Sequence, residues 1–473
     1  MNSISMAAMM PVFTMRTTHD PTALLAAGAA LSARALAAGQ VSAADLCEAS
    51  IARIEALDGA LNAVVVRDFA RARRQAAEAD AALARGERRP LLGVPMTVKE
   101  AFNVAGLPTC WGLPPFRDFV PPHDAVAVQR LKAAGAVILG KTNVPPGLAD
   151  WQCDNPVYGR TVHPLDHART PGGSSGGGAV AVATGMVALE LGSDLTGSLR
   201  VPASFCGVYT HKPSEGLLPT RGFAFPGTEE APSGLPSVIG PIGHCADDLL
   251  LALQVLSGPD AAHVAKACFA LPAPRRAATK DWRVLLLTKH PQAAVAADVR
   301  AAVKGAGQRL AKAGAVVAEA SDLLPDLAEI GDTYDQIVQT MLAHVEPGGR
   351  SPMSLHAWFD LLASRTRVRT QLWALFTQFD AVLCPAVGCA AFEHVSEPDF
   401  RKRTLTVDGA KTPYNALGAW AALASLGGLP ATVAPAGFTK GGLPLGVQIV
   451  GPYFEDRSTI ALARWLTRTA LQK

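Results

Sequence analysis

The feature that most constrains the fold is a repeated order of short apolar run, helical pattern and apolar run. In "AVQRLKAAGAVILGKTN" (127–143) a helical pattern ends at Gly135, and a short apolar run follows at 136–139. The same order recurs after "WRVLLLT" (282–288), where a helical segment leads into "AGAVVAEA". Strand, helix and strand in succession predict an α/β protein whose sheet is covered on both faces.

Other segments fit the same class. Residues 42–62 begin with Ser42 followed by Asp45, and apolar residues recur at helical spacing, which predicts a capped amphipathic helix. Residues 353–379 predict one long helix or a helix pair, and further strands are expected at 94–98, 380–384, 431–435 and 445–451. No segment has the length and polarity of a linker. We therefore expect one domain over 21–473, preceded by a tail at 1–20.

Charge and cysteine content exclude several classes of function. The chain has 43 basic and 40 acidic residues and no basic cluster beyond the short run at 71–74, so we expect no nucleic-acid partner. Eight cysteines without a C-x-x-C pair predict reduced, buried thiols, and Cys384 and Cys389 lack the spacing of a zinc site. His163 and His167 lie in a proline-containing segment, so no metal site is predicted there either.

No apolar run reaches the ~18 residues that a membrane span requires, and the first residues lack the pattern of a secretory signal. These observations predict a cytoplasmic protein without a membrane span.

One motif suggests nucleotide binding. "GAVILGKT" (135–142) matches G-x-x-x-x-G-K-[ST], in which Lys141 would contact phosphates. A phosphate loop needs exposed backbone amides and a helix directly after the lysine. Residues 136–139 are all apolar, and Pro145 and Pro146 interrupt the first turn of such a helix. We interpret the segment as a strand and Lys141 as a structural lysine.

A second motif suggests a serine hydrolase. "GGSSG" (172–176) fits the G-x-S-x-G nucleophile elbow with Ser174 as nucleophile, but the preceding "HPLDHARTPGG" is a polar, proline-broken segment rather than a strand. A serine–histidine hydrolase therefore stays as an alternative, and so does a binding protein in which the glycines only permit tight turns.

A third interpretation uses lysine as the base. Lys99 ends the apolar run 94–98, and a lysine is seldom buried without a special role, although a surface lysine on a half-exposed strand would look alike. Downstream, "TPGGSSGGG" (170–178) and "LTGSLR" (195–200) place serines in two glycine-containing turns.

These stretches resemble the amidase signature enzymes. The resemblance follows the chain in order through "SAADLCEASIARIEALDGALNAVV", "LLGVPMTVKE", "AAGAVILGKTNVP", "NPVYGRTVHPLDHARTPGGSSGGGAVAVA", "GSDLTGSLRVPASFCGV", "HKPSEG" and "GLPLGVQIVG". It is strongest to the branch of fatty-acid amide hydrolases and bacterial aryl or lactam amidases. It implies the amidase signature fold, a mixed twisted sheet between layers of helices, and hydrolysis of linear amides, with carbamates or esters also accepted.

The resemblance assigns roles to three residues. Ser198 is the acylated nucleophile, Ser174 is a relay serine held by a cis peptide bond, and Lys99 is the terminal base. Lysine titrates near ~10.4 in water, and complete burial lowers that value by as much as ~3 to 5 units. The site around Lys99 must therefore be dry.

It also predicts an oxyanion hole from the backbone N–H groups of Leu195, Thr196, Gly197 and Ser198. Thr196 stands where the family normally has glycine. We expect it to narrow the pocket.

Around this loop we expect an ion pair between Asp194 and Arg200, and a substrate pocket that includes Leu148, Trp151 and Cys153. The segment 220–240 is expected to cover it. Small hydrophobic or aryl amides are therefore the expected substrates.

The resemblance implies no metal or organic cofactor, and it makes a homodimer an expected assembly. Glu100 stands where the family usually has aspartate. A non-catalytic binding protein, or a subunit of an amidotransferase, is the alternative on the same fold.

Overall fold

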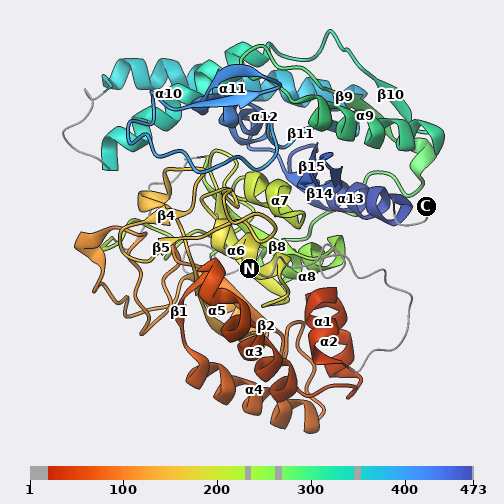
Figure 1. Ribbon diagram of the computed structural model, residues 1–473. Helices are drawn as coiled ribbons and strands as arrows, with labels where there is room; N and C mark the ends of the chain where they lie inside the picture. The colour runs from red at the N-terminus through yellow and green to blue at the C-terminus, as the bar shows by residue number, and fades with distance from the viewer. Residues whose placement is uncertain (1–19, 229–235, 261–268, 346–352, 471–473) are drawn as a thin grey trace.

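A computed structural model describes residues 20–228, 236–260, 269–345 and 353–470. The tail expected at 1–20 lies outside the described residues except for Asp20, and so does part of the segment 220–240. The architecture is a large mixed β-sheet surrounded by α-helices, as the sequence predicts (Figure 1).

The strands of the large sheet follow the order β1-β3-β2-β6-β8-β7-β14-β15-β11-β9-β10, and two further pairs of short strands lie outside it. Their bounds are β1 Val64–Arg67, β2 Pro95–Lys99, β3 Val137–Thr142, β4 Asp154–Asn155, β5 Gly159–Arg160, β6 Leu189–Asp194, β7 Tyr209–Lys212, β8 Val238–Gly243, β9 Arg283–Leu286, β10 Val316–Ala318, β11 Ala381–Pro385, β12 Thr404–Val407, β13 Ala410–Pro413, β14 Ala431–Phe438 and β15 Pro444–Val450.

The helices occur mostly between strands. Their bounds are α1 Pro21–Ala27, α2 Ala29–Ala37, α3 Ala43–Leu61, α4 Phe69–Ala84, α5 Val126–Ala133, α6 Gly176–Ala183, α7 Arg200–Cys206, α8 Ala246–Leu256, α9 Ala297–Lys312, α10 Leu327–Val345, α11 Leu355–Gln378, α12 Ala419–Gly427 and α13 Asp456–Ala470. The segment predicted as one helix or a helix pair at 353–379 is thus a single long helix, α11, at Leu355–Gln378. None of the described helices is both long and apolar enough to cross a membrane.

The sheet mixes parallel and antiparallel pairs. β2 runs parallel to both β3 and β6, while β6 pairs antiparallel with β8. Every residue of β2, β3, β6 and β8 is buried, which requires cover on both faces of the sheet. In Figure 1, α1 to α5 surround one end of the sheet and α9 to α12 the other, with α6, α7 and α8 between them.

Local sequence signals explain the elements that carry the site. The Ser42 hydroxyl accepts a hydrogen bond from the backbone N–H of Asp45 at the start of α3, as its capping pattern predicts. The phosphate-loop motif is instead a turn followed by β3, which contains Lys141, and the next element is a single 3-10 turn at Pro146–Leu148 rather than an α-helix. The nucleotide-binding interpretation therefore finds no support, and Lys141 lies inside the sheet.

Candidate active site

Lys99 is the last residue of β2 and has no solvent-exposed surface. Its Nζ lies 2.7 Å from Ser174 Oγ and 2.9 Å from Ser193 Oγ, within hydrogen-bonding distance of both. Ser193 belongs to β6, the strand that pairs with β2. The amine is thus surrounded by hydroxyl groups at the carboxyl ends of two adjacent strands.

Burial lowers the pKa of Lys99 to about 7, and the more distant negative groups offset this only in part. Within the described part of the chain no carboxylate forms an ion pair with its Nζ. A substantial share of the amine is therefore neutral near pH 7 and can accept a proton, which a base at this position must be able to do.

The glycine-rich loop brings Ser174 to Lys99. The peptide bond between Gly173 and Ser174 is cis, as the resemblance implies. A Cβ at position 173 would lie 2.5 Å from the carbonyl oxygen of Asp150, so only glycine fits there. The N–H of Ser175 donates to the carbonyl of Ser198 over 3.1 Å, which joins the two serine-bearing loops. Among the described residues no histidine forms a hydrogen bond with Ser174 Oγ, whose partner is Lys99, so the nucleophile-elbow alternative finds no support.

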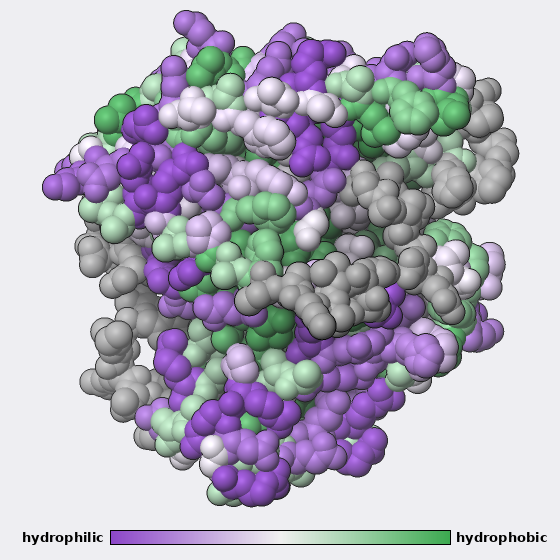
Figure 2. Space-filling model, turned by 180° about the vertical axis from the view of Figure 1, so that it is seen from behind, coloured by the Kyte–Doolittle hydropathy of each residue, from purple (hydrophilic) through white to green (hydrophobic). Residues whose placement is uncertain are grey.

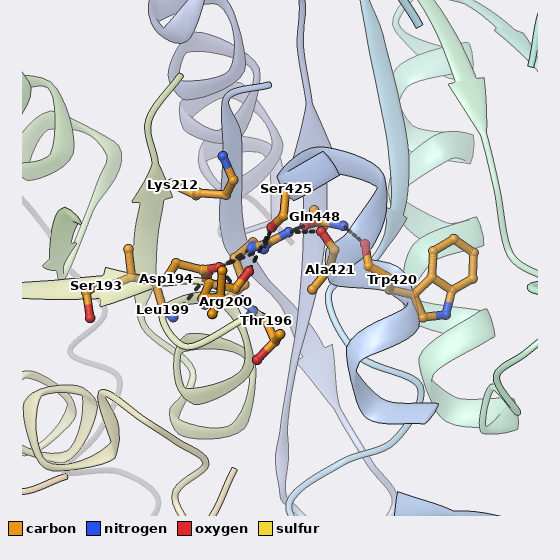
Figure 3. Close-up of polar contacts among 12 residues, drawn as sticks. Ser193, Asp194, Thr196, Leu199, Arg200, Lys212, Trp420, Ala421, Ser425 and Gln448 are labelled. Carbon is orange, nitrogen blue, oxygen red and sulfur yellow. Dashed lines mark hydrogen bonds and ion pairs between the residues drawn. The ribbon is translucent and has the colours of Figure 1, made fainter. Parts of the chain in front are cut away.

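The loop that carries Ser198 is braced by a buried ion pair, as expected (Figure 3). Arg200 donates from Nη2 to Asp194 Oδ1 over 2.7 Å and from Nε to Oδ2 over 3.0 Å. Burial alone would raise the pKa of Asp194, but the adjacent Arg200 guanidinium lowers it to about 2. Asp194 also accepts the N–H groups of Gly197 and Leu199, each over 3.0 Å.

The remaining donors of Arg200 reach residues far away in the sequence. Nη1 donates to Gln448 Oε1 over 2.7 Å and to the Ala421 carbonyl over 3.0 Å, and Nη2 donates to Ser425 Oγ over 2.8 Å (Figure 3). A buried guanidinium with these partners fixes the loop against α12 and β15.

Three of the four backbone N–H groups predicted to form the oxyanion hole have no hydrogen-bond partner among the described residues. Within the described residues the N–H groups of Leu195, Thr196 and Ser198 form no hydrogen bond, whereas that of Gly197 is taken by Asp194. The Leu195 carbonyl accepts from Ser425 Oγ over 2.9 Å and from Tyr334 Oη.

The neighbouring carbonyl is also held. The Trp151 ring donates from Nε1 to the Thr196 carbonyl over 2.9 Å. The Leu195 carbonyl belongs to the same peptide unit as the free N–H of Thr196, so its two hydrogen bonds hold that N–H in orientation.

A cavity of about 1890 Å³ adjoins these loops. Ser174, Ser193 and Ser198 lie on its wall, together with the predicted pocket residues Leu148 and Trp151. Across the face shown in Figure 2, hydrophobic side chains gather in a middle band between two largely hydrophilic regions.

Cys153 is a correction to the predicted pocket. It does not line the cavity but is fully buried behind α6, where a Cβ at Gly176 would lie 2.9 Å from its own Cβ. Burial raises the pKa of the Cys153 thiol to about 12, so the thiol is neutral.

Part of the segment expected to cover the pocket does line it. Phe223 and Phe225 contribute to the cavity wall, and so does Trp111, which the sequence did not single out. Ser193 is a second residue that sequence reasoning missed, although it directly precedes Asp194 in the quoted "GSDLTGS". Among the described residues, no group of three or more histidine, cysteine, aspartate or glutamate side chains could hold a metal ion.

The chain belongs to the Amidase family, which it matches over residues 45–348 and 348–460. It is 32% identical over 470 residues to a glutamyl-tRNA(Gln) amidotransferase subunit from Roseiflexus castenholzii, covering 90% of this chain and 92% of that protein. It is also 32% identical to the AtzE subunit of 1-carboxybiuret hydrolase from Pseudomonas sp. (strain ADP), covering 93% and 97%.

A solved structure with the same fold comes from a vestigial protein complex described as revealing the evolutionary origins of an s-triazine catabolic enzyme. It superposes with a TM-score of 0.81 at 31% identity and covers 93% of this chain and 98% of that one. Fold and family thus agree with the resemblance seen in the sequence.

Proposed function

We propose that this chain hydrolyses the amide bond of small hydrophobic or aryl amides through a Ser198, Ser174 and Lys99 triad. The observation that carries the proposal is the 2.7 Å contact between Lys99 Nζ and Ser174 Oγ in a site where burial lowers the pKa of the amine to about 7. Ser174 and Ser198 line the same cavity, and the hydrogen bond from the Ser175 N–H to the Ser198 carbonyl joins their loops, which supports a relay between the two serines.

The reaction balances with these groups alone. Ser198 Oγ attacks the carbonyl carbon while its proton passes to Ser174 Oγ, and the proton of Ser174 passes to Lys99 Nζ. The free N–H groups of Leu195, Thr196 and Ser198 stabilise the oxyanion. Lys99 then returns the proton through Ser174 to the leaving nitrogen. In the second half, water attacks the acyl carbon and gives a proton through Ser174 to Lys99, and that proton returns to Ser198 Oγ as the acid leaves.

The acyl-enzyme is the intermediate that tests this proposal. A small alkyl fluorophosphonate should label Ser198 in the wild type and not in Ser198→Ala, as mass spectrometry of the peptide would show. Circular dichroism serves as the folding control. Folded wild-type protein without labelling at Ser198 would contradict the proposal.

The substrate class rests on the cavity, whose lining includes Leu148, Trp151 and six further aromatic residues. Hydrolysis of a panel of anilides, fatty amides, short primary amides, carbamates and esters would rank these classes, and a cyclic amide in the panel would test the preference for linear substrates. Aryl and fatty amides should be the best substrates. Fastest turnover of short polar amides would contradict this assignment.

An amidotransferase subunit is the second candidate, because a relative 32% identical over most of its length carries that name. The isolated chain distinguishes the two. Labelling of Ser198 without turnover of any amide in the panel would favour the subunit, whereas turnover by the isolated chain favours the hydrolase.

We further propose that residues 21–473 act as one domain and that the hydrolase forms a homodimer. Analytical ultracentrifugation would test the homodimer.

A further inference from the structure

Three aromatic side chains form part of the lining of the cavity that the two serines also line. We call these residues, Trp111, Phe223 and Phe225, the aromatic wall. The rings of Trp111 and Phe223 stack with centroids 5.7 Å apart and 25° between their planes, and Phe225 meets Trp111 edge-on at 5.7 Å. Such a surface suits a flat aromatic group.

The orientation of Trp111 is fixed at three points. Its backbone adopts the left-handed conformation, with a φ of 53°, which is uncommon for a residue other than glycine. Its N–H donates to Glu100 Oε2 over 2.9 Å, and its carbonyl accepts from the N–H of Gly147 over 2.9 Å. Its ring Nε1 donates to the Ala101 carbonyl over 3.2 Å. The ring therefore has little freedom to turn away from the cavity.

Glu100 holds this segment from inside the protein. Its side chain has no exposed surface, and Oε1 accepts the N–H of Cys110 over 2.8 Å and the hydroxyl of Tyr158 over 3.1 Å. Together with the bond from Trp111, a single carboxylate binds two consecutive backbone N–H groups. A buried carboxylate needs a compensating charge, and Lys141 Nζ lies 3.7 Å from Oε1.

Lys141 binds Pro108 and Thr109, the two residues that precede Cys110 and Trp111. Its Nζ donates to Thr109 Oγ1 over 2.7 Å and to the carbonyl of Pro108. Glu100 and Lys141 therefore divide the four consecutive residues 108–111 between them, although they belong to different parts of the chain. This contact gives a structural reason for the lysine in the misleading "GAVILGKT" motif.

We propose that Glu100 and Lys141 are positioning residues that fix the aromatic wall, and that this wall makes the chain selective for amides carrying a flat aromatic group. The inference rests on the proposed function, because it assigns a substrate class to the same cavity. Neither residue lines the cavity, so both act through Trp111.

The test compares kcat and KM for two aryl amides, benzamide and acetanilide, with those for the aliphatic butyramide. Trp111→Ala should lower the preference for the aryl amides about tenfold, mainly by raising their KM. Glu100→Asp withdraws the carboxylate by one methylene and should lower the preference about threefold to fivefold in the same way. A merely structural role would reduce turnover of all three amides by one common factor.

Asp58→Asn is the matched control. Asp58 is also a buried carboxylate that accepts two consecutive backbone N–H groups, those of Ala63 and Val64, and it pairs with Arg67. It does not line the cavity. This variant should lower stability without changing the aryl preference.

Should Glu100→Asp fail to fold, the double variant Glu100→Gln with Lys141→Met keeps the volume without buried charge and takes its place. Equal losses for aryl and aliphatic amides in the Trp111 and Glu100 variants would overturn the inference. Calorimetric binding of benzamide to Ser198→Ala, with and without Trp111→Ala, gives a readout independent of turnover. Weaker binding upon loss of Trp111 supports the inference even if the wild type hydrolyses nothing, whereas unchanged binding overturns it.

Discussion

Two buried lysines lie on neighbouring strands, and their surroundings differ. Lys99 ends β2, and Lys141 lies near the end of the adjacent β3, where it pairs in register with Val98. Both are fully buried. Among the described residues, Lys99 Nζ bonds to the hydroxyls of Ser174 and Ser193 alone, whereas Lys141 contacts the Glu100 carboxylate.

Burial acts on both amines in the same direction. It lowers the pKa of Lys99 to about 7 and that of Lys141 to about 8, and for Lys141 the Glu100 carboxylate acts against it by raising the pKa. Hydroxyl partners can relay a proton, while a carboxylate partner stabilises the ammonium form. The comparison indicates that the partner, rather than depth in the protein, separates a lysine that can act as a base from a structural one.

The largest expected effect is on activity. Lys99→Met should lower kcat/KM about 10³-fold because no other group takes the proton from Ser174. Lys141→Met should lose less than about tenfold, mostly through the KM of aryl amides. Steady-state kinetics on benzamide would measure both. Similar losses in the two variants would break the comparison.

For stability we expect the opposite order, with the loss in Lys141→Met rather than in Lys99→Met. Lys141→Met leaves the Glu100 carboxylate buried without its counter-charge and should lower the free energy of unfolding by about 3 kcal/mol. Lys99→Met removes a buried amine that has no anionic partner among the described residues and should leave stability equal or higher. Urea denaturation at pH 7 gives both values. A larger loss for the Lys99 variant would show that its amine is paired.

The pH dependence of stability sharpens the distinction. The pKa of Lys99 is about 7 in the folded chain, while an unfolded lysine titrates near ~10.4. Between these values the unfolded chain binds more protons, so the free energy of unfolding rises with pH, by at most about 1.4 kcal/mol per pH unit for this residue. Urea denaturation at pH 7, 8 and 9 should show a shallower rise for Lys99→Met. Parallel curves for the two proteins would contradict the lowered pKa.

The smallest effect concerns the second hydroxyl at Lys99. Ser193→Ala removes one of the two hydrogen-bond partners of the amine but leaves Ser174 in place. Loss of one such bond should lower kcat/KM about threefold to tenfold. Kinetics beside Ser174→Ala, expected to lose far more, would test this order. An equal loss in both variants would make Ser193 part of the relay.

Local patterns predicted much of the fold. The apolar run before Lys99 and the helical pattern of residues 42–62 appear in the structure as β2 and α3, because short-range periodicity determines each of them. The contact between Lys99 and Ser174 was expected from the resemblance, and the structure has it at 2.7 Å.

Contacts between distant segments could not be predicted in the same way. Gln448 and Ser425 bind Arg200 across more than 220 residues of sequence, and nothing near them indicates this contact. Trp111 was missed because its position depends on Glu100, and Cys153 was misplaced because the sequence does not show which side of α6 faces the cavity. Such pairings arise only when the sheet brings separate strands together.

The most direct test of the central claim is the pH dependence of fluorophosphonate labelling at Ser198, which needs no knowledge of the substrate. In the wild type the labelling rate should rise with an apparent pKa of about 7 as Lys99 loses its proton. In Lys99→Met the rate should be at least about 10²-fold lower, without that rise. A wild-type rate independent of pH between 6 and 9, or one unchanged in Lys99→Met, would contradict the account.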